Sequence, residues 1–202
     1  MTSRQVLSQT RIVPRKFYER PTLRVARDLL GKLIVHRAGP ELLAGRIVET
    51  EAYLGVNDPA AHTARGRTER TRVIFGPPGH AYVYLCYGMY DCLNLVTEPD
   101  GSAGCVLIRA LEPVAGLDGI RRRRPKAQRL RDLASGPGKL TMALGIGPEH
   151  YGADVTRGLL TVRAFRLPRD FETVTSRRVG ISAAQELPYR YYIKDNEHVS
   201  GR

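Results

Sequence analysis

The sequence predicts one domain of the mixed α/β (α+β) class, in which strands and short helices alternate along 202 residues. A chain of this length can bury a core of its own. Residues 46–94 carry strand-like patterns of period two, whereas residues 21–31 and 135–145 carry helix start and stop signals. No repeat, linker or low-complexity tract divides the chain. We therefore expect residues 1–202 to form a single domain.

The first elements follow from local signals. Residues 1–14 lack the apolar core of a signal peptide and are expected to form a short flexible N-terminus. Pro21 at a first helical position and Gly31 as a C-terminal cap predict a short amphipathic helix. Residues 32–37 and 43–54 are then predicted strands. In an extended strand one face would carry Ile47, Glu49, Glu51 and Tyr53, and the other Val48, Thr50, Ala52 and Leu54.

A hairpin is predicted over residues 81–96, where a run of strand formers is interrupted at residues 87–90. Gly88 can supply the positive φ of the turn, which would place an aromatic side chain at the tip. Residues 104–110 are a further predicted strand, and the pattern becomes helical after Pro113. The second predicted helix ends near Gly145, and its start with Lys139 could bind an anion.

The composition favours an anionic partner. The chain has 32 Lys and Arg against 20 Asp and Glu, a net charge of +12, and nucleic acid is the commonest polyanion. A general basic bias of the source proteome is the alternative. The run at residues 121–126 fits a solvated or phosphate-contacting face better than a localisation signal. The polar loop after Asp58 adds Arg65, Arg67, Arg70 and Arg72.

The cysteines and the apolar runs predict an intracellular protein without membrane contact. Cys86, Cys92 and Cys105 are odd in number and lack metal-ligand spacing, so we expect reduced thiols and no zinc site. The uncharged run at residues 73–90 is broken too often by Gly and Pro for a membrane helix.

Several side chains in the central stretch could carry chemistry. Glu49 and Glu51, about 6.6 Å apart along one strand face, could act about a single water molecule. The alternative is two exposed glutamates on an open sheet face. His62 alone is more often a satisfied loop or core residue than a catalyst. The tyrosines could be core packing or a stacking platform for bases, and they are Tyr82, Tyr84, Tyr87 and Tyr90.

Six blocks together resemble the alkyladenine (3-methyladenine) DNA glycosylase family. They occur in the expected order and extend the match from about Phe17 to Ser200. One departure from the family pattern is Thr71, where many members have Asn. The blocks are Arg46-Ile-Val-Glu-Thr-Glu-Ala-Tyr-Leu-Gly55, Ala60-Ala-His62, Tyr82-Val-Tyr84 with Tyr87-Gly-Met-Tyr90, Asn94, Cys105-Val-Leu-Ile-Arg109-Ala-Leu-Glu-Pro113 and Ser135-Gly-Pro-Gly-Lys-Leu140.

The resemblance implies a curved, largely antiparallel sheet with flanking helices and a protruding β-hairpin that enters the DNA minor groove. Tyr87 matches the residue that wedges into the duplex where the damaged nucleotide is flipped out. The flipped base would be sandwiched by Tyr53, His62 and Tyr84. Asn94 matches a pocket residue that discriminates among purines by crowding a guanine amino group.

The resemblance also implies roles in catalysis and DNA binding. Glu51 matches the general base that holds the attacking water, with Arg109 and the backbone carbonyl of Val179 completing its cradle. A carboxylate suits this role because the glycosidic carbon becomes cation-like as the base departs. Contacts to the DNA backbone are expected from Arg67, Arg70 and Lys139.

We therefore expect a monofunctional DNA glycosylase of base excision repair that removes alkylated purines, with deaminated or etheno purines as further candidates, from double-stranded DNA. It would need no metal or cofactor, and act as a monomer in the cytoplasm, on the bacterial nucleoid. Strand cleavage would require an amine nucleophile, and of the few lysines only Lys139 lies near the predicted core. The rivals are a non-catalytic nucleic-acid-binding protein, and a carbohydrate hydrolase using Glu49 and Glu51 that the +12 charge disfavours.

Overall fold

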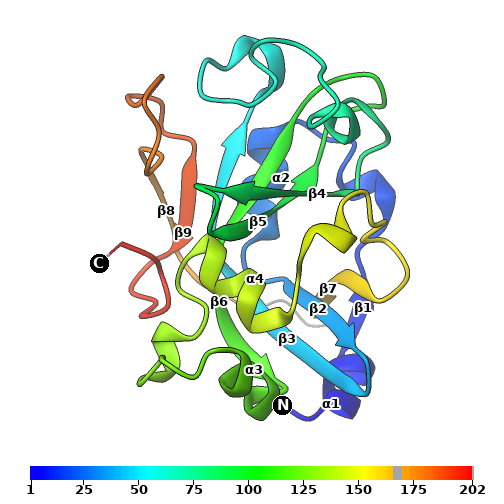
Figure 1. The fold of residues 1–202 in the computed structure, drawn as a ribbon, viewed down its shortest axis with the longest axis vertical. Helices are drawn as coiled ribbons and strands as arrows, with labels where there is room; N and C mark the ends of the chain where they lie inside the picture. Colours follow the sequence, from blue (N-terminus) through cyan, green and yellow to red (C-terminus); the bar gives the residue numbers. More distant parts are fainter. Residues whose placement is uncertain (166–169, 202) are drawn as a thin grey trace.

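One open antiparallel sheet organises the fold (Figure 1). The computed structural model describes residues 1–165 and 170–201. Within them the strand order is β1-β7-β2-β3-β6-β5-β4, while β9 pairs with β3 and β8. This arrangement, with helices around it, confirms the mixed α/β fold class. The strands are β1 (Thr10–Ile12), β2 (Leu33–Ala38), β3 (Glu41–Tyr53), β4 (Ala81–Cys86), β5 (Tyr90–Val96), β6 (Cys105–Ala115), β7 (Leu160–Phe165), β8 (Thr173–Ser176) and β9 (Arg190–Ile193).

The long strand β3 is the centre of the sheet. One of its edges pairs with β6, and the other pairs first with β2 and then, from Glu49 to Glu51, with β9. Helix α2 (Thr22–Leu29) packs against it as well. Because both edges are paired and the strand is covered, even its polar residues Glu49, Thr50 and Glu51 are buried.

Irregular pairing between β3 and β6 changes the predicted faces. Val48 on β3 and Arg109 on β6 have no residue opposite them, so each strand carries a bulge. As a result Ile47 and Val48 both pack into the main core, although simple alternation would separate them. Strand β6 also runs past the predicted end at residue 110, because Pro113 lies at a register shift, where a missing N–H is tolerated.

The N-terminal residues 1–14, expected from the sequence to form a short flexible segment, contain a helix and a strand. Helix α1 (Ser3–Gln9) begins with a capping box in which the Thr2 and Gln5 side chains satisfy each other's backbone N–H groups. Val6 of α1 is fully buried with β2 and β3 residues, which is worth about 1.5–3 kcal/mol. Strand β1 then pairs with β7.

Of the remaining helices, α4 (Pro137–Leu144) packs beside the hairpin made by β4 and β5. Helix α4 crosses in front of the sheet beside β5 (Figure 1) and ends at Gly145 as predicted. Helix α3 (Leu117–Arg123) contacts α4, and two cations of its basic run, Arg122 and Arg123, pair with Glu41.

None of the described helices is long and apolar enough to span a membrane. Five short 3₁₀ turns complete the described part: η1 (Arg15–Phe17), η2 (Gly55–Asn57), η3 (Arg72–Phe75), η4 (Leu130–Asp132) and η5 (Pro148–His150).

Contact between α4 and the hairpin gives a prediction for Gly138. A Cβ at this position would lie 2.6 Å from Cβ of Tyr90, a rigid part of its neighbour. Gly138→Ala should therefore push α4 from the hairpin and lower the free energy of unfolding by about 1–3 kcal/mol. Urea denaturation measures this. Gly152→Ala tests steric crowding against backbone strain, because Gly152 has open space at its Cβ but a positive φ; equal losses in the two variants would contradict the steric explanation.

Candidate active site

The hairpin tip presents one tyrosine to solvent. Tyr87 and Gly88 have φ angles of 51° and 67°, and the Met89 N–H donates to the Cys86 carbonyl at 3.0 Å. Two successive positive φ angles are the signature of a tight type I′ hairpin turn, and they are uncommon for a tyrosine. Tyr87 is 78% exposed at the tip, where the sequence predicted an aromatic side chain.

Beside this hairpin lies a cavity of about 640 Å³ with aromatic walls. Tyr53, His62, Tyr84 and Asn94, the four predicted base-binding residues, all line it. The His62 and Tyr84 rings meet edge to face, with centroids 4.6 Å apart. The Asn94 side chain is held by a hydrogen bond from its Nδ2 to the Tyr82 carbonyl at 3.2 Å. The volume is ordinary for a small-molecule site.

His62 is held as a neutral ring within this wall. Its Nδ1 lies 2.9 Å from the Tyr82 hydroxyl. Burial and the nearby Arg70 guanidinium lower the pKa of His62, and burial raises the pKa of Tyr82 to about 12. Both groups are therefore uncharged at neutral pH. An uncharged aromatic surface can stack on a base of either charge state.

Glu51 lies directly behind the cavity wall and is fully buried, so the exposed-glutamate alternative is wrong. Its Oε1 accepts the Val179 N–H at 2.7 Å, and its Oε2 accepts the Tyr53 hydroxyl at 3.0 Å. Arg109 Nη1 lies 3.3 Å from Oε2. Tyr53, Arg109 and Val179 themselves line the cavity. Three donors leave one of the roughly four carboxylate lone-pair sites for a fourth, such as water.

Glu49 has a different environment from Glu51. It accepts from Arg109 Nε at 3.1 Å, from Arg190 Nε at 2.6 Å and from the Ser200 N–H at 2.7 Å. The Arg109 side chain therefore joins the two carboxylates, and its Nη1 also donates to the Val179 carbonyl at 3.4 Å. Glu49 therefore supplies counter-charge to both Arg109 and Arg190.

The charge state of Glu51 reflects opposing effects. Burial raises the pKa of Glu51 above its usual range, while Arg109, the Val179 N–H and the Tyr53 hydroxyl counteract this. Burial opposes a charge on Arg109, yet the two glutamates hold the pKa of Arg109 above its ordinary value. A carboxylate with a raised pKa is a stronger base than a solvated one, which suits proton abstraction.

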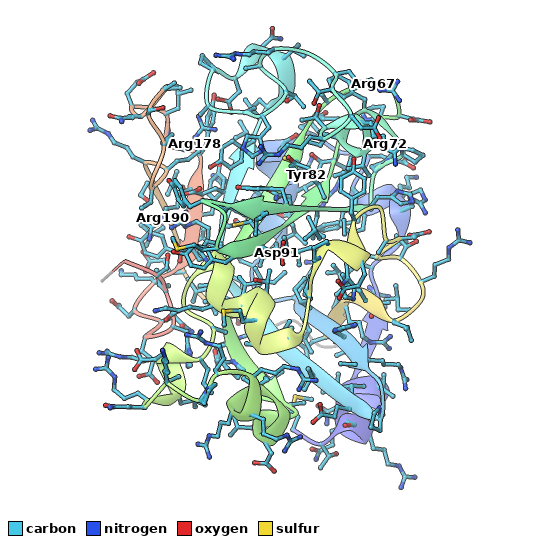
Figure 2. The ribbon with its side chains drawn as sticks, in the orientation of Figure 1. Arg67, Arg72, Tyr82, Asp91, Arg178 and Arg190 are labelled. Carbon is cyan, nitrogen blue, oxygen red and sulfur yellow. The ribbon has the colours of Figure 1, made fainter. Side chains whose placement is uncertain are left out.

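Two buried residues of this region were missed by the sequence analysis. Asp58 and Arg178 form a forked ion pair at 2.5 and 2.9 Å, and both side chains are almost fully buried. Figure 2 shows Arg178 between the segment after β3 and the loop that precedes β9. Asp58 carried only a turn signal, and no local pattern distinguishes Arg178 from the other arginines.

The three expected DNA-backbone residues lie in different places. Arg70 lines the cavity, and its guanidinium carbon lies 5.1 Å from the Tyr84 ring centroid. Arg67 is exposed on the same loop (Figure 2), and Lys139 is exposed in the first turn of α4. Neither Arg67 nor Lys139 lines the cavity.

Comparison with known proteins gives the class. The sequence profile of the methylpurine-DNA glycosylase family matches residues 16–197, and the chain belongs to this family. The protein is thus a DNA glycosylase, an enzyme that hydrolyses N-glycosidic bonds. This excludes the non-catalytic and carbohydrate-hydrolase alternatives.

Several relatives match over nearly their whole length. A protein of Methanoculleus marisnigri is 52% identical over 94% of this chain and 99% of its own length. One of Methanocella arvoryzae is 51% identical over 95% and 96%, and one of Alkaliphilus oremlandii is 48% identical over 92% and 97%. Each carries the provisional name 3-methyladenine DNA glycosylase.

The two glutamates should differ in their effect on stability. Glu49→Gln removes the carboxylate that pairs with Arg190 and leaves Arg109 with Glu51 alone, and it should cost roughly 3–5 kcal/mol of unfolding free energy. Glu51→Gln should cost less, because burial already disfavours the charged form of Glu51. Urea denaturation at pH 7 compares them, and a larger loss in Glu51→Gln would contradict the assignment of Glu49 as the structural carboxylate.

Proposed function

We propose that this glycosylase flips a damaged purine out of double-stranded DNA into the aromatic cavity and hydrolyses its N-glycosidic bond with one water molecule activated by Glu51. The observation that carries the proposal is the position of Glu51. It is a buried carboxylate of raised pKa, one residue layer behind a base-sized aromatic cavity. The relatives' names support a methylated purine as substrate.

Each step has a residue that fits it. The planar base would stack against Tyr53 on one side and His62 with Tyr84 on the other. Glu51 would take the water's proton as the water attacks the sugar carbon, and its charge would stabilise the cation-like transition state. Arg109 and the Val179 carbonyl would help to hold the water. The reaction leaves an intact abasic site, because the exposed Lys139 does not line the cavity and offers no amine there.

Entry of the base requires unstacking, and the hairpin offers a replacement. Tyr87 would fill the space left by the flipped nucleotide, which compensates an unstacking cost of a few kcal/mol. The exposed cations Arg67 and Lys139, together with Arg70 at the cavity, would contact phosphates. Alkylated purines carry positive charge and leave easily, so we propose them as principal substrates, with hypoxanthine and ethenoadenine as candidates that need protonation. Action as a monomer on the nucleoid stays a prediction.

The decisive variant is Glu51→Gln. It should bind a duplex containing one 7-methylguanine as the wild type does, and should lose about 10²–10⁴-fold in base release, the usual contribution of a general base. Single-turnover excision, read out by alkaline cleavage of abasic sites, measures this loss. Glu112→Gln is the matched control, because Glu112 pairs with Arg46 and does not line the cavity. Wild-type excision by Glu51→Gln would overturn the mechanism.

Tyr87 gives a second test through its ring. Tyr87→Ala should weaken binding to lesion-containing duplex by about 1–3 kcal/mol, the scale of base–aromatic stacking, whereas Tyr87→Phe should keep the affinity. Both variants must adopt the same positive φ, so the comparison isolates the ring. Fluorescence of a base analogue next to the lesion reports flipping. An unchanged signal and affinity in Tyr87→Ala would assign this side chain no part in DNA distortion.

A further inference from the structure

The loop between β8 and β9 has one fully buried side chain, in addition to the bond from the Ala52 N–H to the Tyr189 carbonyl at 2.8 Å. In residues 177–189, all of which the structure describes, Arg178 is the only buried residue. The loop contains turns and bends but no helix or strand. Its neighbour Val179 is 42% exposed and supplies both a donor to Glu51 and a carbonyl to Arg109. Val179 thus directly follows the buried anchor Arg178 in the chain.

Both terminal nitrogens of Arg178 are hydrogen-bonded. Its two terminal nitrogens donate to the two oxygens of Asp58, and Nη1 also donates to the Ala52 carbonyl at 3.0 Å. Asp58 in turn accepts the backbone N–H groups of Leu54 and Ala60, each at 3.1 Å. The pair thus connects the loop before β9 to the chain that leaves β3. Although burial opposes it, these hydrogen bonds, led by the one from Arg178, hold the pKa of Asp58 below its usual range.

The same guanidinium also orients Tyr53. Its carbon lies 4.7 Å from the Tyr53 ring centroid and 5.3 Å from that of Tyr189, so the Tyr53 ring packs on a guanidinium that Asp58 holds by two hydrogen bonds. The Tyr53 hydroxyl donates to Glu51 Oε2, while the Val179 N–H donates to Oε1. One arginine therefore positions two of the three groups that hold Glu51.

We propose that Asp58 and Arg178 are a positioning pair for the catalytic carboxylate, setting the orientation and proton affinity of Glu51 through Tyr53 and Val179. The proposal rests on the proposed role of Glu51. A stabilising role alone does not account for the pair, because buried ion pairs are often no more stabilising than apolar residues of similar volume. The segment it anchors contributes no other buried side chain but contains two atoms of the Glu51 and Arg109 network.

The proposal has a consequence for pH dependence. Glu51 faces Arg109 from β6, Glu49 and Tyr53 on β3, and the Val179 N–H, with Arg178 beyond Tyr53. The Val179 and Tyr53 hydrogen bonds favour the charged form of Glu51. Loosening both raises the pKa of Glu51. Because Glu51 acts as a base, activity falls as the pH drops through this pKa, so the acidic limb of the rate profile moves to higher pH.

Arg178→Lys tests the positioning role. It retains the positive charge but removes the paired hydrogen bonds to Asp58 and the flat surface that packs on Tyr53. Single-turnover excision of 7-methylguanine should fall about 10- to 100-fold, as expected for a catalytic group displaced by about 1 Å. The dissociation constant for lesion duplex should stay within about threefold of wild type, since the pair lies behind the cavity wall. The acidic limb should move up by about one pH unit. A cationic lesion is used because its departure needs no protonation step.

Two further variants make the result unambiguous. Asp154→Asn is a matched control: Asp154 accepts from Arg15 and from the Thr156 N–H, but it does not line the aromatic cavity. It should lower thermal stability without moving the acidic limb. Asp58→Asn should reproduce the Arg178→Lys shift, and it decides the matter if Arg178→Lys does not fold.

The outcomes separate this inference from the proposed function. If Glu51→Gln is inactive while folded Arg178→Lys or Asp58→Asn keeps the wild-type rate and acidic limb, the positioning role is wrong and the role of Glu51 stands. The positioning role is equally wrong if the excision rate of these variants falls but the acidic limb of their rate profile does not move. If Glu51→Gln retains wild-type excision, the proposed function itself fails.

Discussion

The structure depends on the burial of two carboxylates, Glu49 and Glu51, on a strand whose edges are both paired. An ionised carboxylate away from water is expensive unless charged or polar groups surround it. Here Arg109 contacts both carboxylates, Arg190 and the Ser200 N–H complete Glu49, and Val179 with Tyr53 completes Glu51. These partners come from β6, β9, the loop before β9 and the C-terminal residues. Segments that are far apart in the sequence therefore all contact strand β3 at this site.

This arrangement divides the work between the two glutamates. Glu49 is saturated by three strong donors, two of them cationic, and so serves to keep the arginines in place. Glu51 receives one cation and two neutral donors, and its burial raises its pKa. In the proposed mechanism Glu51 acts as a base, and it lies behind Tyr53 and Arg109, which both line the cavity.

Much of the framework was predictable because its signals are local. Gly88 in the hairpin turn and Gly145 at the end of α4 act through their own backbone angles, and the structure confirms both. The start of α1 also carries a local signal, the Thr2–Gln5 capping box, which the sequence analysis did not use. The bulges at Val48 and Arg109 and the Asp58–Arg178 pair could not be predicted. Each depends on a contact between residues far apart in sequence. The backbone preference of a turn residue predicts its role directly. The identity of an arginine in a polar loop does not predict which carboxylate it will bind.

The net charge of +12 takes on a definite meaning once the buried pairs are separated from the rest. Arg109, Arg178 and Arg190 are neutralised inside the protein by Glu49, Glu51 and Asp58, and contribute nothing to a field felt by a polyanion. The surplus is therefore carried by exposed side chains such as Arg67 and Lys139. Under the proposed function, attraction to DNA and chemistry on a base would therefore use separate sets of charges. Affinity would change with salt, through counterion release, while the proton affinity of Glu51 would be set by buried groups that salt does not reach.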